Sequence, residues 1–150
     1  MQQFDRDLML LLNDVARLLR TRFDQRARAR GMTRAQWVIL ARVNAKPGLS
    51  QNELASLLEV EPISVGRLID RLEGRGLVER RPDPADRRIR RLHLLPAAEP
   101  VLEDITKARE ILGVELLDGV DAATRTQMVD ALLRMKNNLT AEPAPLAVGE

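Results

Sequence analysis

Arginine is concentrated in one short stretch of this chain. Residues 81–91 read RPDPADRRIRR, and Arg87, Arg88, Arg90 and Arg91 lie within five residues of one another. Such closely spaced guanidinium groups repel each other unless a polyanion is near. A face that is merely solvated is the simpler alternative, but the crowding argues against it. The stretch therefore predicts a surface that binds nucleic acid.

Within this stretch, Asp86 and Arg88 form a D-x-R pattern at a loop tip. An arginine at such a tip can enter a narrow minor groove of DNA, where the negative potential is enhanced. An aspartate two residues earlier can orient the guanidinium group through a charge-assisted hydrogen bond. The neighbouring Arg87, Arg90 and Arg91 fit phosphate contacts, which add affinity without sequence information.

A second group of polar side chains lies on the predicted helix over residues 62–74. There Ser64, Arg67 and Arg71 fall opposite an apolar stripe made by Val65, Leu68, Ile69 and Leu72. Arginine can bind the O6 and N7 edge of guanine bidentately, so Arg67 is the first candidate for a base contact. The alternative is a solvated arginine paired with Asp70 or Asp86.

Residues near the starts of two predicted helices can also contact DNA. Ser64 can bind a phosphate or a base, and Ile63 can touch a thymine methyl group, although ordinary packing of Ile63 is an equal alternative. Ser50 and Gln51 open the preceding helix, where a phosphate contact is compatible with capping. For Ser50, capping alone is the simpler interpretation.

The elements that must position these residues follow from capping and periodicity. Ser50 to Glu53 has the S-x-x-E form of a capping box and opens a short helix, and Pro62 suits the first position of the next helix. Gly74 and Gly76 end that helix, and residues 77–80 and 89–95 read as paired strands. Helix, turn, helix and a basic hairpin in this order predict a winged helix-turn-helix.

The rest of the chain is predicted to be helical. A long helix spans Phe4 to about Arg28, and Thr33 to Gln36 is a second capping box that opens a helix containing Trp37. After Pro96, a helix over about 97–118 is followed by a last helix with Asp121 as its N-cap. The expected fold is mostly α with a small β-hairpin.

Both ends of the chain are rich in leucine, and the first helix has a broad apolar surface. We expect residues 1–32 and 97–140 to form a dimerisation region across a two-fold axis, with 33–96 as the DNA-binding lobe. A monomeric helical cap over the winged helix is the alternative. Residues 141–150 are rich in Pro and Ala and are expected to be disordered.

Composition excludes several other classes. The net charge is +2, but residues 1–96 carry +7 and residues 97–150 carry −5, so the basic groups gather in the predicted DNA-binding part. Cysteine is absent and His93 is the single histidine, which argues against disulfides, thiolate sites and a histidine metal site. No membrane span, cofactor or catalytic constellation is expected, and the predicted location is cytoplasmic, on the nucleoid.

With these elements in order, the chain resembles the MarR/SlyA family of bacterial transcription regulators. The resemblance rests on MTRAQWVIL at 32–40, EPISVGRLIDRLE at 61–73 and DPADRR at 83–88, and AEP at 98–100 with LDGV at 117–120 is most like the SlyA branch. It implies an obligate homodimer on palindromic operators, a recognition helix in the major groove and a wing in the minor groove. It implies the DNA roles named above for Arg67, Asp86 and Arg88.

The resemblance also implies release of the DNA by small, often aromatic, anionic molecules. Trp37 with Arg17, Arg20 and Thr33 is the candidate effector pocket, because arginines beside an indole can hold an aromatic carboxylate or a phenol. A core tryptophan with surface arginines is an equal alternative. We therefore expect a repressor; a ligand-independent architectural or counter-silencing DNA binder and a winged-helix protein-interaction module are the other interpretations.

Overall fold

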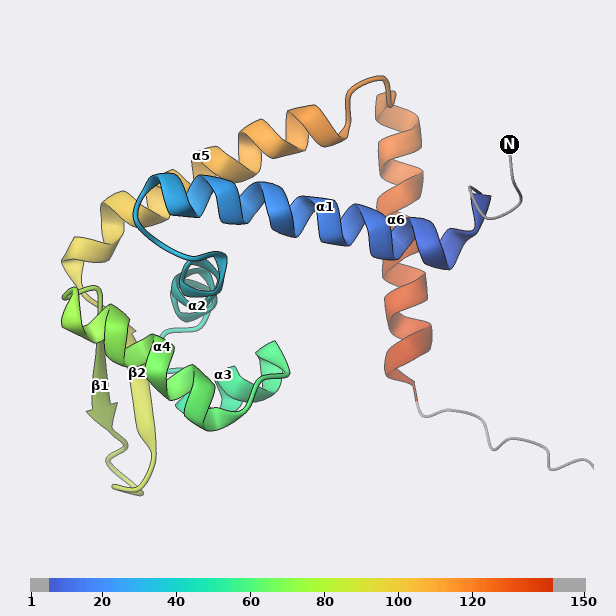
Figure 1. The fold of residues 1–150 in the computed structure, drawn as a ribbon. Coiled ribbons are helices and arrows are strands. Elements are labelled where there is room, and N and C mark those ends of the chain that lie inside the picture. Colours follow the sequence, from blue (N-terminus) through green and yellow to red (C-terminus); the bar gives the residue numbers. More distant parts are fainter. Residues whose placement is uncertain (1–5, 142–150) are drawn as a thin grey trace, which may run out of the picture. The chain divides into compact units, whose positions relative to one another are not determined.

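The computed structural model describes residues 6–141, and the chain divides into two compact units, one up to Leu112 and one from Gly113 onward. Its elements in chain order are α1 (Leu8–Ala29), α2 (Arg34–Ala45), α3 (Gln51–Leu58), α4 (Pro62–Gly74), β1 (Val78–Pro82), β2 (Arg90–Leu94), the 3-10 turn η2 (Pro96–Ala98), α5 (Glu99–Leu116) and α6 (Ala122–Thr140) (Figure 1). The predicted class, mostly α with one hairpin, is confirmed. Phe4, the predicted start of the first helix, and residues 142–150 of the predicted tail lie outside the described residues.

Side-chain caps determine where the first three helices begin. The Asp7 carboxylate accepts hydrogen bonds from the backbone N–H groups of Met9 and Leu10, at 2.9 and 3.0 Å, so α1 begins at Leu8. Both predicted capping boxes are confirmed, with Thr33 opening α2 and Ser50 opening α3. Each satisfies N–H groups that the first helical turn leaves without a partner.

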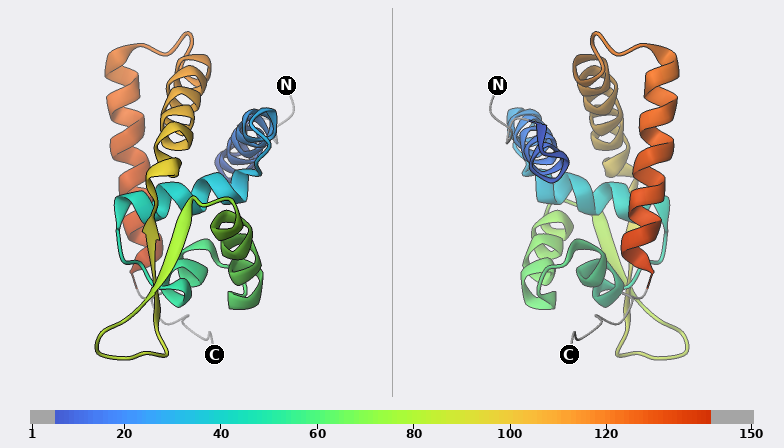
Figure 2. Two further views of the ribbon diagram at one scale, coloured as in Figure 1. Left: turned by 90° about the vertical axis from the view of Figure 1, so that its left-hand side faces the viewer. Right: turned by 90° about the vertical axis from the view of Figure 1, so that its right-hand side faces the viewer.

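The winged helix consists of α3, α4 and an antiparallel hairpin in which Val78 pairs with Leu94 and Pro82 with Arg90. The observed strands are 78–82 and 90–94, so β1 lies one to two residues later than predicted. The connection between α2 and α3 pairs with β2. The Leu92 N–H donates to the Leu49 carbonyl at 2.9 Å, and Ser50 forms an isolated antiparallel β-bridge with Arg91. The loop of the hairpin projects beyond α3 and α4 (Figure 2).

One hydrophobic core holds the elements of the first unit together. Fully buried side chains come from α2, α3, α4 and both strands: Ile39, Leu40, Val43, Leu54, Val65, Ile69, Leu72, Val78 and Leu92. Ile105 and Ala108 of α5 join the same cluster, and Leu68 is only partly buried at its edge. Each buried aliphatic side chain contributes about 1.5–3 kcal/mol of transfer free energy. The buried stripe thus determines which face of α4 turns toward the core, and the opposite face is left to solvent.

The second unit contains the end of α5, a turn and α6. The Asp121 side chain caps α6 as predicted and accepts from the Thr124 N–H at 2.8 Å. Arg125 donates to the carbonyls of Val120 and Leu117 at 2.7 and 3.0 Å and so closes the turn. No residue of α6 is buried. Apolar side chains of α6 such as Val129 and Leu133 are therefore exposed within the described chain.

Candidate nucleic-acid interface

The exposed face of α4 carries the residues predicted for base contact. Pro62 occupies the first turn, where its missing N–H costs no helical hydrogen bond. Ser64, Arg67 and Arg71 are exposed on α4, while the opposite stripe is in the core. Ile63 is 72% exposed, so within the described chain it does not pack as a core residue. The first turn of α4 thus offers an apolar side chain and a hydroxyl beside two arginines.

The alternative pairing of Arg67 with Asp70 or Asp86 is not observed. Asp70 binds Arg80 instead, at 2.7 Å, and Asp86 binds Arg88. Within residues 6–141, neither Arg67 nor Arg71 has a carboxylate at ion-pair distance. Two guanidinium groups on this face are therefore available to an external anion.

The D-x-R pattern of the wing forms the pair that the sequence predicted. The Asp86 carboxylate accepts from the Arg88 Nε at 3.1 Å, from its Nη2 at 3.2 Å and from its backbone N–H at 3.0 Å. These bonds to Arg88 hold the pKa of Asp86 below its usual range. The Arg88 side chain is nevertheless 91% exposed. Its guanidinium group is thus oriented by Asp86 and still reachable from solvent.

The base of the wing is held by Asp83, a residue for which no role was predicted from the sequence. Its carboxylate accepts from Arg91 Nε at 2.5 Å and from the backbone N–H groups of Ala85 and Asp86 at 2.7 and 3.1 Å. The Arg91 bond, followed by those two N–H groups, lowers the pKa of Asp83. Arg91 also donates to the Gly48 carbonyl at 3.0 Å. The guanidinium group of Arg91, which the sequence grouped with the phosphate contacts, therefore binds the protein itself.

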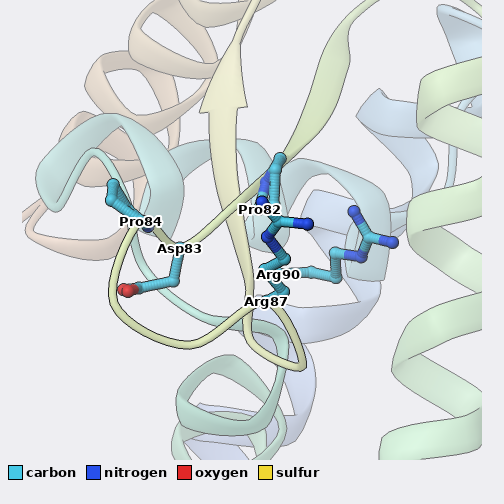
Figure 3. Close-up of a pocket in the computed structure, with 5 residues that line it drawn as sticks. All are labelled: Pro82, Asp83, Pro84, Arg87 and Arg90. Atoms are coloured by element: carbon cyan, nitrogen blue, oxygen red, sulfur yellow. The ribbon is translucent and has the colours of Figure 1, made fainter.

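Arg87 and Arg90 remain exposed on the wing. They line an open cavity of about 450 Å³ together with Pro82, Asp83 and Pro84. Figure 3 shows the Asp83 carboxylate directed away from the guanidinium groups of Arg87 and Arg90. Neither arginine has an ion pair within the described chain. Their charges are thus not neutralised by Asp83, the carboxylate that lines the same cavity.

The start of α3 lies beside the base of the wing. Ser50 is buried, and its hydroxyl accepts from the Glu53 N–H at 3.1 Å, so capping is its observed role. The returning bond from the Ser50 N–H lowers the pKa of Glu53. The Gln51 side-chain oxygen accepts from Arg80 at 3.2 Å. The start of α3 and the hairpin loop both line a small cavity of about 130 Å³. Its lining residues are Ser50, Gln51, Asn52, Arg88, Ile89 and Arg90.

Two of the four predicted effector residues share a cavity. Arg20 and Trp37 line a largely apolar space of about 370 Å³ in the first unit, whereas Arg17 and Thr33 do not. Arg17 pairs with Asp14 at 3.2 Å on the exposed side of α1, and Thr33 is occupied as a cap. The other lining residues are Ala16, Leu19, Phe23, Arg34, Val38, Ala41, Ile105 and Arg109.

Two of these residues, Arg34 and Arg109, were not predicted from the sequence. Arg34 could have been found, because it lies three and four residues before Trp37 and Val38 on one helical face. Arg109 comes from α5, and no local signal connects it to α2. The buried Trp37 indole N–H has no hydrogen-bond partner within residues 6–141. The cavity therefore combines an aromatic wall with three arginines.

The described residues contain no group of three His, Cys, Asp or Glu side chains placed to hold a metal ion. None of the helices in the described part of the chain is both long and apolar enough to cross a membrane.

Comparison with known proteins gives consistent results. The model of the MarR family matches residues 32–89, which run from just before α2 to the end of the hairpin loop. The solved structure of MarR is 27% identical, with a TM-score of 0.82, and the match covers 93% of this chain and 94% of that one. SlyA is also 27% identical, with a TM-score of 0.78 over 89% and 94% of the two chains. The transcriptional regulator PA3341 is 31% identical, with a TM-score of 0.78 over 89% of this chain and 98% of that one.

Proposed function

Because the chain belongs to the MarR/SlyA family of winged-helix transcription regulators and is thus a DNA-binding regulator, we propose that it represses transcription by binding a palindromic operator as a homodimer. The observation that carries this proposal is that four arginines of α4 and the wing are exposed and have no ion pair in the described chain. Arg67, Arg71, Arg87 and Arg90 are exposed without an ion pair in the described chain, while nearby carboxylates are bound to Arg80, Arg88 and Arg91. A surface of this kind binds the phosphates and base edges of DNA.

In the proposed complex, α4 enters the major groove and the wing reaches the minor groove. Arg67 reads a guanine, Ile63 meets a thymine methyl group, and Ser64 binds a base or a phosphate. Arg88 enters the minor groove in the orientation that Asp86 gives it. Phosphates are bound by Arg71, Arg87 and Arg90. Further phosphate contacts come from the start of α3, at Ser50 and Gln51.

A homodimer is supported by apolar surface that the described chain leaves exposed. On α1, Leu8 and Leu18 are each 54% exposed and Val15 is 43% exposed. On α6, Val129 and Leu133 are 55% and 53% exposed. A monomer that kept such helices in water would lose the burial that stabilises amphipathic helices. Two copies related by a two-fold axis would also present two recognition helices to two half-sites.

An effector would bind in the cavity lined by Trp37. An aromatic carboxylate or phenol can place its ring against the indole and the apolar side chains, with its anionic group near Arg20, Arg34 or Arg109. Such a ligand acts by favouring a dimer geometry whose recognition helices no longer match the operator. Because the target is chromosomal DNA, the working location is the nucleoid in the cytoplasm.

The experiment that tests this function is selection of DNA from a random-sequence library by the full chain, followed by affinity measurements at fixed salt. We expect an enriched inverted repeat, bound by two copies of the chain and weakened by small aromatic anions. Enrichment without an effect of any such anion would favour a ligand-independent architectural or counter-silencing binder. Failure to enrich any sequence would contradict the proposal and favour a protein-interaction module.

A further inference from the structure

Arg80 is the most highly connected side chain of the hairpin, although the sequence marks it only as a strand residue. Its guanidinium group donates to the Gln51 Oε1 at 3.2 Å through Nε and to the Gly66 carbonyl at 3.1 Å through Nη2. Through Nη1 it binds the carboxylates of Asp70 and Glu73 at 2.7 and 2.8 Å. The side chain is only 20% exposed.

The partners of Arg80 come from two other elements. Gly66, Asp70 and Glu73 occur at intervals of four and three residues on α4, so they share one side of that helix. Gln51 is the first residue of α3. One guanidinium group on β1 therefore ties the wing strand to both helices of the helix-turn-helix.

The contacts of Arg80 set the orientation of α4 in a way that burial of its apolar side chains cannot. Burial of Val65, Ile69 and Leu72 is favourable in any orientation that keeps them from water, because the hydrophobic effect has no direction. A guanidinium fork has fixed donor directions and so sets both the rotation and the axial position of the helix it binds. Hydrogen bonds to base edges need donor–acceptor distances of about 2.7–3.2 Å, so a small rotation of α4 would disrupt them.

Arg80 also fixes the side chain of Gln51. Because Arg80 Nε donates to Oε1, the amide of Gln51 is oriented with its oxygen toward Arg80. The two N–H donors of Nε2 are left for another acceptor. Gly66 provides the space, because a Cβ atom at that position would lie 3.0 Å from the Gln51 Nε2. Gln51 in turn lines the cavity between the start of α3 and the base of the wing.

We propose that Arg80 is a positioning residue for sequence reading, which sets the orientation of α4 and the amide of Gln51 without itself contacting a base. The proposal rests on the DNA-binding function above. It differs from that function in predicting that a residue turned toward the protein controls the ratio of specific to non-specific affinity.

The test compares Arg80→Ala, Arg80→Lys and a matched control, Arg81→Ala, in the full chain. Arg81 is the next residue of β1, is 56% exposed and, among residues 6–141, pairs only with Glu79, so its removal also deletes one charge and frees a carboxylate. The two probes are the duplex that the wild-type chain enriches from a random library and a random-sequence duplex of equal length. Thermal unfolding of each variant is measured in parallel.

We expect the ratio of specific to non-specific affinity to fall about tenfold in Arg80→Ala, the loss of roughly one bidentate base contact. Arg80→Lys should show a similar fall, because an ammonium group cannot reach all four acceptors together. Arg81→Ala should weaken both complexes in parallel and leave the ratio unchanged.

An unchanged ratio of specific to non-specific affinity in folded Arg80→Ala or Arg80→Lys would overturn the proposal. Unfolding of both variants would also overturn it, because Arg80 would then act on stability rather than on sequence recognition. If the wild-type chain enriches no duplex, the proposed function fails instead, and the two failures are thereby distinguished.

Discussion

At the scale of single residues, the arginines of α4 and the hairpin differ in whether they bind the protein or are free to bind an external anion. Arg80 and Arg91 are turned toward the protein, and each binds a carboxylate and a backbone carbonyl. Arg67, Arg71, Arg87 and Arg90 have no ion pair in the described part of the chain. Arg88 combines both properties, since it is oriented by Asp86 and exposed. Substitutions in the two groups should therefore have different signatures in DNA binding.

Arg67→Ala should reduce discrimination among sequences, at a cost of about 1–3 kcal/mol for each contacted base. Arg90→Ala should weaken binding to all sequences alike and reduce the slope of affinity against salt concentration, because it removes a phosphate contact. Titrations of enriched and random duplexes at several salt concentrations check both expectations. The division of work is wrong if the two variants show the same ratio of specific to non-specific affinity.

Arg88→Ala should lose more affinity for an operator with A·T-rich flanks than for one with G·C-rich flanks, because a narrow minor groove attracts the guanidinium group. Asp86→Ala should reproduce that loss, and the double variant should add little, since the two residues act as one unit. A double-mutant cycle at fixed salt measures this coupling. Additive losses, or tighter binding by Asp86→Ala, would show that Asp86 does not orient Arg88.

At the scale of elements, the wing is a loop shaped by one carboxylate. Asp83 accepts from Arg91 and two backbone N–H groups, and the Asp83 N–H donates to the Ile89 carbonyl at 3.0 Å. The wing is also joined to the connection before α3 through the contact of Arg91 with Gly48. Its shape should therefore depend on the ionisation of Asp83.

The lowered pKa of Asp83 gives the sign of this dependence. A carboxylate whose pKa is lower in the folded state stabilises that state above its unfolded pKa of about 3.9 and loses the contribution as the pH falls through the folded pKa. Wing order should thus persist at neutral pH and fail only in strong acid. Carboxyl NMR titration should give Asp83 a midpoint below about 3.9 that rises in Arg91→Ala. A midpoint unaffected by that substitution would contradict the account.

Prediction from sequence succeeded where the signal is local. Capping boxes at Thr33 and Ser50 and the apolar stripe of α4 involve residues within one or two turns, so they fix helix starts and faces without tertiary information. Arg80 and Arg91 could not be separated from the other arginines in this way. Their partners Gln51 and Gly48 lie far away in sequence, and only the packing of the hairpin on α3 brings them close.

The effector site shows the same limit. Arg17 and Arg20 are both arginines of α1, but only Arg20 faces the cavity with Trp37, while Arg17 bonds to Asp14 on the exposed side. The arginine that α5 contributes, Arg109, has no local pattern that points to Trp37.

At the scale of the whole molecule, the account requires a second copy of the chain. No residue of α6 is buried, so a charge introduced at the 45% exposed Leu132 should not disturb a core of its own unit. Leu132→Glu should weaken dimerisation at least about tenfold, because the charge must be desolvated in an apolar interface. Gln127→Glu adds the same charge to α6 and is the control.

Sedimentation equilibrium at micromolar concentrations checks this expectation. A truncation that removes the first 25 or so residues should also lose dimerisation and specific DNA binding. A wild-type chain that sediments as a monomer would favour the helical cap instead.

The central claim is that two copies read DNA through α4 in the major groove and the wing in the minor groove. Dimethyl sulfate footprinting of the enriched duplex tests it most directly, because the reagent methylates guanine N7 in the major groove and adenine N3 in the minor groove. We predict protected guanines in two half-sites about one helical turn apart, flanked by protected adenines. The guanine protection should disappear in Arg67→Ala and the adenine protection in Arg88→Ala. A single protected tract without two-fold symmetry, or protection unchanged in both variants, would contradict the account.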